Sequence, residues 1–196
     1  VDAVTGAAWL ATAGAWICEE GIWESVKESL WANPQTQPTP QVALGVDFGL
    51  LATVDNYRTL KIGEKEATLD DEQRNAVYTA AMHRITVITG GAGAGKTLVA
   101  KQIVKFFTDG DVRVMLCAPT GKAARRLTEV IGLPASTIHR LLAYDGLSGR
   151  FTYNADNPLP DGVVICDEAS MIDTPIGNSL ISACGPNTAL VLIGDP

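Results

Sequence analysis

The sequence of 196 residues predicts an α/β fold, a parallel sheet with flanking helices, on three observations. Four short apolar runs have the length and composition of buried strands. Helical patterns separate these runs, as parallel strands require, because each crossover needs a dozen or more residues. Glycine, proline or aspartate directly follows each run and marks its end. The four runs are residues 85–89, 112–118, 163–166 and 189–193.

The N-terminal third of the chain is predicted to be an appendage to this sheet. Residues 2–32 have a helical pattern whose tryptophans recur every seven residues, as in the core stripe of a packed helix. Stacking of these rings on single-stranded nucleic acid is the alternative, which the lack of interleaved basic residues disfavours. A proline-rich stretch then indicates a stiff linker, and residues 42–62 suggest a small β element. The tryptophans are Trp9, Trp16 and Trp23, and the predicted parts are 1–33 (helical), 34–68 (linker with β element) and 69–196 (α/β domain).

A helix is predicted directly before the first strand of the sheet. The stretch from Thr68 to Asp71 has the pattern of a capping box, which starts a helix. Its apolar positions share one face: Leu69, Ala76, Val77, Ala80 and Ala81. Gln73 lies in the first turns, where contact with a ligand and a solvated surface position are equally favoured.

The strongest chemical signal follows the strand at 85–89. Gly90, four further residues and then Gly95, Lys96 and Thr97 match the Walker A spacing, and a helix continues over 98–107. Glycines let backbone N–H groups point inward, and the positive end of the helix dipole favours a polyphosphate there. Lys96 can reach the β- and γ-phosphates, and the Thr97 hydroxyl can bind Mg²⁺. We therefore expect ATP to be bound by Gly91, Ala92, Gly93, Ala94, Gly95, Lys96, Thr97 and Leu98.

A glycine-rich turn without a ligand is the alternative, which the order of strand, loop and helix disfavours.

The densest basic cluster of the chain follows the strand at 112–118. Lys122, Arg125 and Arg126 open a helix at the carboxyl end of that strand, the edge where ligands bind in doubly wound sheets. Thr120 and Lys122 favour contact with a nucleic-acid backbone. For the two arginines, this contact and a solvated helix face are equally favoured. The formal net charge of −7 excludes a globally basic nucleic-acid binder, so such contacts must be local.

Two weaker elements come next. Ser136 is expected to cap a short helix that carries His139, and a lone histidine is more often structural than functional. Residues 144–160 are polar and rich in glycine, proline and asparagine, which predicts a surface loop or a loose hairpin.

Two adjacent carboxylates, Asp167 and Glu168, follow the apolar run at 163–166. One of them can hold Mg²⁺, and the other can polarise a water for in-line attack on a γ-phosphate. Two acids after a strand are common in isolation, but together with a Walker A loop they indicate an ATP-hydrolysing site. A helix over 171–184 and the last strand complete the predicted fold.

The cysteines and the apolar N-terminus bear on location. Four cysteines show no metal-binding spacing, and Cys117 and Cys166 are predicted to be buried free thiols, which indicates a reducing, cytoplasmic compartment. Residues 3–18 lack a basic flank, are short for a membrane span and contain Gly6 and Gly14. We therefore expect no membrane association.

Six segments together resemble the ordered motifs of superfamily 1 DNA helicases of the RecD-like branch. They are LDDEQRNAV, TGGAGAGKT, CAPTGKAARRL, STIHRLL, ICDEASMID and LIGDP, and the resemblance covers residues 69–196. It implies the first RecA-like motor domain, a P-loop NTPase fold that binds ATP and Mg²⁺ against a second motor domain. It also implies movement 5′ to 3′ along single-stranded DNA, in DNA repair or recombination.

The resemblance also implies a role for each matching residue. Gln73 would recognise adenine; Gly95, Lys96 and Thr97 would bind phosphates and Mg²⁺; Asp167 would bind Mg²⁺ and Glu168 the attacking water. Thr120, Lys122 and His139 would line the DNA path, and Asp195 would couple hydrolysis to DNA. Lys122 stands where relatives often have arginine, which loses a bidentate fork.

The sequence departs from the family pattern at its end. In the family, a glutamine follows the GDP motif, and a second motor domain with arginine fingers comes later in the chain. Both would come after Pro196, so we expect the chain to be a piece of a longer protein. Without those cations we expect weak nucleotide binding and poor hydrolysis.

Two other functions stay open. A phosphotransferase acting on a small molecule would need a substrate lid and no DNA, and the adjacent acids disfavour it. A non-catalytic, ATP-gated interaction module joined to another enzyme through residues 1–68 would be indifferent to the change Glu168→Gln.

Overall fold

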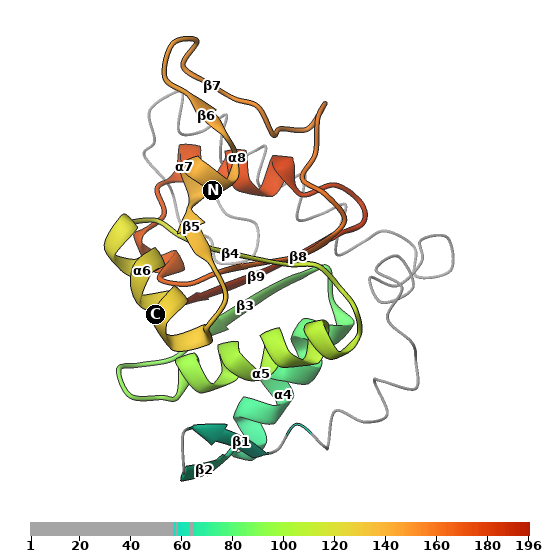
Figure 1. Cartoon of the computed structure of the whole chain (residues 1–196), viewed down its shortest axis with the longest axis vertical. Coiled ribbons are helices and arrows are strands. Elements are labelled where there is room, and N and C mark those ends of the chain that lie inside the picture. Colours follow the sequence, from blue (N-terminus) through green and yellow to red (C-terminus); the bar gives the residue numbers. More distant parts are fainter. Residues whose placement is uncertain (1–56, 58, 63–64) are drawn as a thin grey trace, which may run out of the picture.

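The computed structural model describes residue 57 and residues 59–62 and 65–196 (Figure 1). The predicted helical segment, its tryptophans and the proline-rich linker lie outside the described residues, as does Cys18. Within the described part, no helix combines the length and the apolar character needed to cross a membrane.

Five parallel strands form the central sheet in the order β3-β9-β8-β4-β5. Helices flank the sheet, which confirms the predicted α/β class (Figure 1). Since all five strands run the same way, their carboxyl ends meet at one edge. The strands are β3 (Ile85–Thr89), β4 (Val114–Ala118), β5 (Ala135–Thr137), β8 (Gly162–Cys166) and β9 (Thr188–Gly194). The sequence predicted four of them and missed the three-residue β5.

Helices cover both faces of the sheet. In Figure 1, α4 (Asp71–Met82) and α5 (Lys96–Asp109) lie on one side, and α7 (Ile138–Leu141) and α8 (Thr174–Ala183) lie on the other. Strand β8 serves both sides, because its side chains alternate: Val163 and Ile165 belong to the core under α5, whereas Val164 and Cys166 belong to the core under α8. The fifth α-helix of the described residues, α6 (Gly121–Ile131), follows β4, and a 3₁₀ turn (Ala169–Met171) precedes α8.

Two predicted helix caps were wrong by one or two residues, and strand pairing explains both. Thr68 ends β2 and pairs with Thr59 of β1, so α4 is capped by Asp70, which forms the capping box with Gln73. Residues 135–137 pair with β4, so the cap of α7 is Thr137 rather than Ser136. The helix predicted over 171–184 also begins later, because Asp173 caps α8.

Two hairpins lie outside the central sheet. Strands β1 (Thr59–Ile62) and β2 (Lys65–Thr68) pair antiparallel; the β element predicted at 42–62 overlaps this hairpin in β1, and most of its span lies outside the described residues. Strands β6 (Tyr144–Asp145) and β7 (Arg150–Phe151) also pair antiparallel, which confirms a loose hairpin within residues 144–160.

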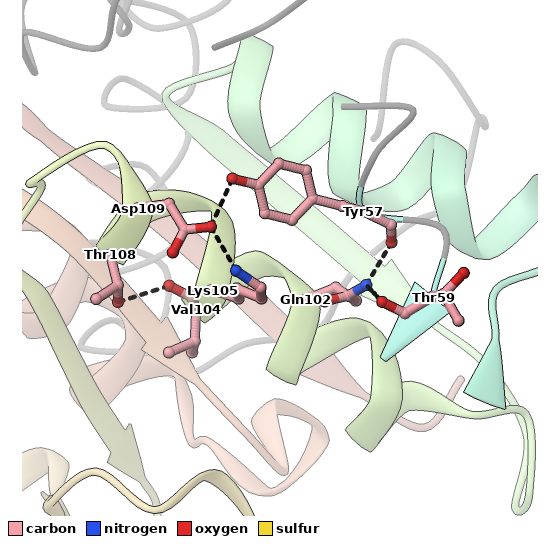
Figure 2. Close-up of polar contacts among 7 residues, drawn as sticks. All are labelled: Tyr57, Thr59, Gln102, Val104, Lys105, Thr108 and Asp109. Atoms are coloured by element: carbon pink, nitrogen blue, oxygen red, sulfur yellow. Dashed lines mark hydrogen bonds and ion pairs between the residues drawn. The ribbon is translucent and has the colours of Figure 1, made fainter. Parts of the chain in front are cut away.

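The entry into β1 is fixed to the far end of α5 (Figure 2). The buried Gln102 donates through Nε2 to the backbone oxygens of Tyr57 and Thr59. The Tyr57 hydroxyl donates to Asp109 at 2.8 Å, and the ammonium of Lys105 contacts the same carboxylate at 2.5 Å. Burial, followed by the bond to Asp109, raises the pKa of Tyr57 to about 12. The hydrogen bond from Lys105 lowers the pKa of Asp109.

Cys117 and Cys166 are buried free thiols, as predicted, and Cys184 is a third.

Candidate nucleotide-binding site

The phosphate loop lies between β3 and α5. Gly95 directly precedes α5 and has φ +80°, in the left-handed region. A Cβ at this position would collide with the Gln73 amide, so glycine is required for both conformation and space. Helix α5 then begins with Lys96, and its first backbone N–H groups lack partners within the helix. These groups and the positive end of the helix dipole form a site for phosphate oxygens.

Lys96 is held in place by three oxygen atoms. Its ammonium lies 2.5 Å from the Gly90 oxygen, 2.9 Å from the Gly91 oxygen and 2.6 Å from a carboxylate oxygen of Asp195. The side chain of Lys96 is 20% exposed, whereas that of Asp195 is 58% exposed. Asp195 follows β9, so this ion pair joins the end of β9 to the phosphate loop.

The acid pair lies at the end of β8. The Asp167 N–H donates to the Cys117 oxygen at 3.0 Å and thereby continues the pairing of β8 with β4. Glu168 has φ +56° and ψ +36°, a left-handed conformation that costs a residue other than glycine about 1–3 kcal/mol. Such strain clusters at functional sites but also occurs in turns, as at Asp111 and Ala143 among the described residues, so at Glu168 it supports the catalytic role that the sequence predicts and does not establish it.

Gly194 lets the end of β9 approach this turn. A Cβ on Gly194 would lie 2.8 Å from the Ser170 nitrogen and 3.3 Å from the Ala169 nitrogen. Any larger residue at 194 would therefore force the end of β9 away from the turn that follows the acid pair.

One cavity of about 390 Å³ brings these elements together, a volume typical of small-molecule sites. Its polar lining contains two cations, three carboxylates and one hydroxyl. The Thr97 hydroxyl and the carboxylates are hard oxygen ligands of the kind that Mg²⁺ prefers, so the donor set fits this ion. The lining residues are Ala92, Gly93, Ala94, Gly95, Lys96, Thr97, Arg126, Asp167, Glu168 and Asp195.

Three of the predicted nucleotide-site residues do not line the cavity. The Gly91 oxygen accepts from the Lys96 ammonium and from the Ala94 N–H, and Leu98 packs against the hydrophobic core. Gln73 contacts the loop: its Nε2 donates to the Ala94 oxygen at 3.1 Å, and its Oε1 accepts from the Asp70 N–H. Gln73 therefore joins α4 to the phosphate loop through both ends of its amide.

The predicted nucleic-acid contacts do not line the cavity. Thr120 caps α6 after β4, and its hydroxyl accepts from the Ala123 N–H. Lys122 is exposed on the same helix. His139, on α7 after β5, packs edge-on against Tyr144 of the hairpin, with ring centroids 5.5 Å apart. Phe151 of β7 lies 5.6 Å from the same imidazole ring.

The sequence interpretation missed two features of this edge. Arg126 lines the cavity, whereas the sequence distinguished it in no way from Arg125. The aromatic cluster around His139 was also missed, although Tyr144 and Phe151 stand out in an otherwise polar segment.

Comparisons with known proteins agree with this geometry. A family model described as an AAA domain matches residues 73–196. The chain is 44% identical over 127 residues to the ATP-dependent RecD2 DNA helicase of Deinococcus radiodurans, an alignment that covers 65% of this chain and 18% of that protein. It is 38% identical over 179 residues to the RecBCD enzyme subunit RecD of Haemophilus influenzae, with 73% and 28% covered. These relatives confirm the RecD-like resemblance.

The chain thus spans about a fifth to a quarter of the length of these two proteins. Among solved structures, the crystal structure of bacteriophage T4 UvsW matches with a TM-score of 0.54 at 12% identity, over 73% of this chain and 34% of that one. At this identity the match bears on the fold alone.

Proposed function

Since the chain belongs to the AAA domain family, we propose that it is the ATP-binding lobe of a DNA helicase that moves 5′ to 3′ along single-stranded DNA. The observation that carries this proposal is the cavity shared by the phosphate loop, Lys96 and the acid pair. The relatives named above as a DNA helicase and as a RecBCD subunit support the same assignment. The buried free thiols support a reducing compartment such as the cytoplasm.

Binding would begin with the triphosphate tail. The free backbone N–H groups at the start of α5 would bind phosphate oxygens, and the Lys96 ammonium would reach the β- and γ-phosphates. Lys96 is already oriented by Gly90 and Gly91, so little side-chain freedom would be lost when the nucleotide binds. Asp195 would give up part of its contact with Lys96 to the phosphates, which provides a link from nucleotide to the end of β9.

Hydrolysis would depend on the acids after β8. Thr97 and Asp167 would hold Mg²⁺, which supplies charge neutralisation at the phosphate oxygens when it is bound. The Glu168 carboxylate would orient the attacking water and accept its proton. The left-handed backbone at Glu168 and its place in the lining of the cavity support this role.

DNA and the second motor domain complete the proposal. Thr120, Lys122 and His139 would line the DNA path at the ends of β4 and β5. The second motor domain of the parent protein would close over the nucleotide and supply arginine fingers, which are worth roughly 10³ to 10⁵ in rate in related reactions. We therefore expect the chain alone to bind nucleotide weakly and to hydrolyse it slowly.

The test is the ATPase rate of the complete parent protein with and without single-stranded DNA. We expect DNA to stimulate hydrolysis and Lys96→Ala to abolish it, whereas Lys101→Ala, on the same helix outside the cavity, should have little effect. Unwinding of a duplex with a 5′ overhang, but not of one with a 3′ overhang, would establish the direction. Hydrolysis that ignores DNA would contradict the helicase and favour the phosphotransferase.

A further inference from the structure

Arg126 is a cation that lines the nucleotide cavity and to which the proposed mechanism assigns no role. It lies on α6, which buries Ala124 and Leu127 and exposes both Arg125 and Arg126. Of these two arginines, only Arg126 lines the cavity. Consecutive helical residues point about 100° apart, so neighbours of the same chemistry serve different surfaces.

The partners of the two cations in the cavity differ. Lys96 already contacts three oxygen atoms, one of them a carboxylate oxygen of Asp195. Within the described part of the chain, Arg126 makes no hydrogen bond and no ion pair. Its guanidinium stays charged at all physiological pH values and presents a planar fork of donors that matches phosphate oxygens. Arg126 is thus a cation available for an anionic ligand in a cavity that already contains a phosphate loop.

The order of the strands indicates which phosphate Arg126 would meet. Along the carboxyl edge, the phosphate loop follows β3, the acid pair follows β8, and α6 follows β4, the neighbour of β8 on the side away from β3. A triphosphate that is held by the loop and reaches the acid pair with its terminal phosphate points toward α6. Arg126 therefore approaches from the side of the terminal phosphate and the attacking water.

We propose that Arg126 binds the γ-phosphate of the nucleoside triphosphate and makes this lobe distinguish triphosphate from diphosphate. This inference rests on the proposed nucleotide site. Lys122 lies one helical turn before Arg126, so α6 also carries a candidate DNA contact. The alternative ligand of Arg126 is therefore a phosphate of the DNA backbone, and the experiment distinguishes this phosphate from the γ-phosphate.

The experiment measures nucleotide and DNA affinities of the complete parent protein by calorimetry and fluorescence anisotropy. The variants are Arg126→Ala, Arg126→Lys and, as a matched control, Arg125→Ala. The nucleotide probes are ADP and a non-hydrolysable ATP analogue, each with Mg²⁺. Arg126→Ala should weaken the analogue about 10- to 100-fold, the range for a charged hydrogen bond, and change ADP less than about twofold. Arg126→Lys should recover part of the lost affinity for the analogue, and Arg125→Ala should leave the affinities for both nucleotides unchanged.

Several outcomes would overturn the inference. Equal losses for ADP and the analogue would make Arg126 a general electrostatic or structural residue. An unchanged affinity for the analogue with weaker DNA binding would assign it to the DNA. Both outcomes leave the nucleotide site intact, provided that Lys96→Ala still weakens the analogue. If Lys96→Ala leaves that affinity unchanged, the proposed nucleotide site fails, and the inference fails with it.

Discussion

The carboxyl edge of the sheet has two halves that differ in how their polar side chains are held. At the ends of β3, β9 and β8, the charged side chains converge on one cavity, and Lys96 has three oxygen partners. At the ends of β4 and β5, Lys122 is exposed and, among the described residues, contacts no acceptor, while His139 rests on aromatic rings. The first half is preorganised for a small anionic ligand of fixed shape, whereas the second is an open surface suited to a long, uniform one.

This difference implies two kinds of mutational effect. Substitutions after β3, β9 and β8 should have large effects that are confined to nucleotide binding and hydrolysis, because preorganised contacts act at fixed positions. Substitutions of the exposed residues after β4 and β5 should have modest effects on DNA affinity that depend on salt, because an exposed lysine contacts phosphates in water. Helix α6 belongs to both halves, since Thr120 and Lys122 lie at its start and Arg126 lines the cavity.

The largest effect is expected at Glu168. Glu168→Gln keeps the shape of the side chain but removes the base, so the DNA-stimulated kcat should fall about 10²- to 10⁴-fold. Affinity for the ATP analogue should stay within about threefold, because Gln still accepts a hydrogen bond. Steady-state ATPase and calorimetry measure both quantities. Asp161→Asn, at the other end of β8, is the matched control and should leave kcat unchanged.

An unchanged kcat in the Glu168→Gln protein would contradict the catalytic role of the first half and favour the ATP-gated interaction module.

A smaller effect is expected at Lys122, in the open half. Lys122→Ala should weaken single-stranded DNA binding several-fold and reduce the slope of log Kd against log salt by about 0.7, the value for one phosphate contact. Nucleotide affinity should not change, because Lys122 does not line the cavity. Anisotropy titrations at several salt concentrations measure the slope. If Lys122→Ala changed nucleotide affinity but not the salt slope of DNA binding, the proposed difference between the two halves would be wrong.

Sequence patterns predicted the first half well because its determinants are local. The spacing from Gly90 to Thr97 forms the loop by itself, and the rule that parallel strands end at one edge brings Asp167 and Glu168 to it. The confirmed buried thiols follow equally from the apolar runs that contain them. Contacts and cavities, by contrast, depend on how elements pack.

The missed features depend on such packing. Whether Arg125 or Arg126 faces the cavity is set by the rotation of α6 about its axis, which the alternation of apolar residues leaves open. The caps at Asp70 and Thr137 are selected by strand pairing that extends the preceding residues. For Gln73 the sequence left ligand contact and a surface position equally favoured; its amide contacts Ala94 and Asp70, a placement that depends on how the start of α4 packs against the loop.

The smallest effect is expected at Tyr57, which belongs to neither half of the carboxyl edge. Its hydroxyl contacts Asp109 at the end of α5, away from the phosphate loop (Figure 2). Tyr57→Phe removes one hydrogen bond to Asp109 and should lower the free energy of unfolding by about 0.5–1.5 kcal/mol, with nucleotide and DNA affinities unchanged. The raised pKa of Tyr57 means that the folded chain holds this proton more tightly than the unfolded chain. Its stabilisation is therefore complete below pH 10 and is lost as the pH rises from 10 to about 12. Urea unfolding across this window should show a steeper loss for the original chain than for Tyr57→Phe; since Lys105 is present in both, parallel losses would mean that Tyr57 does not contribute.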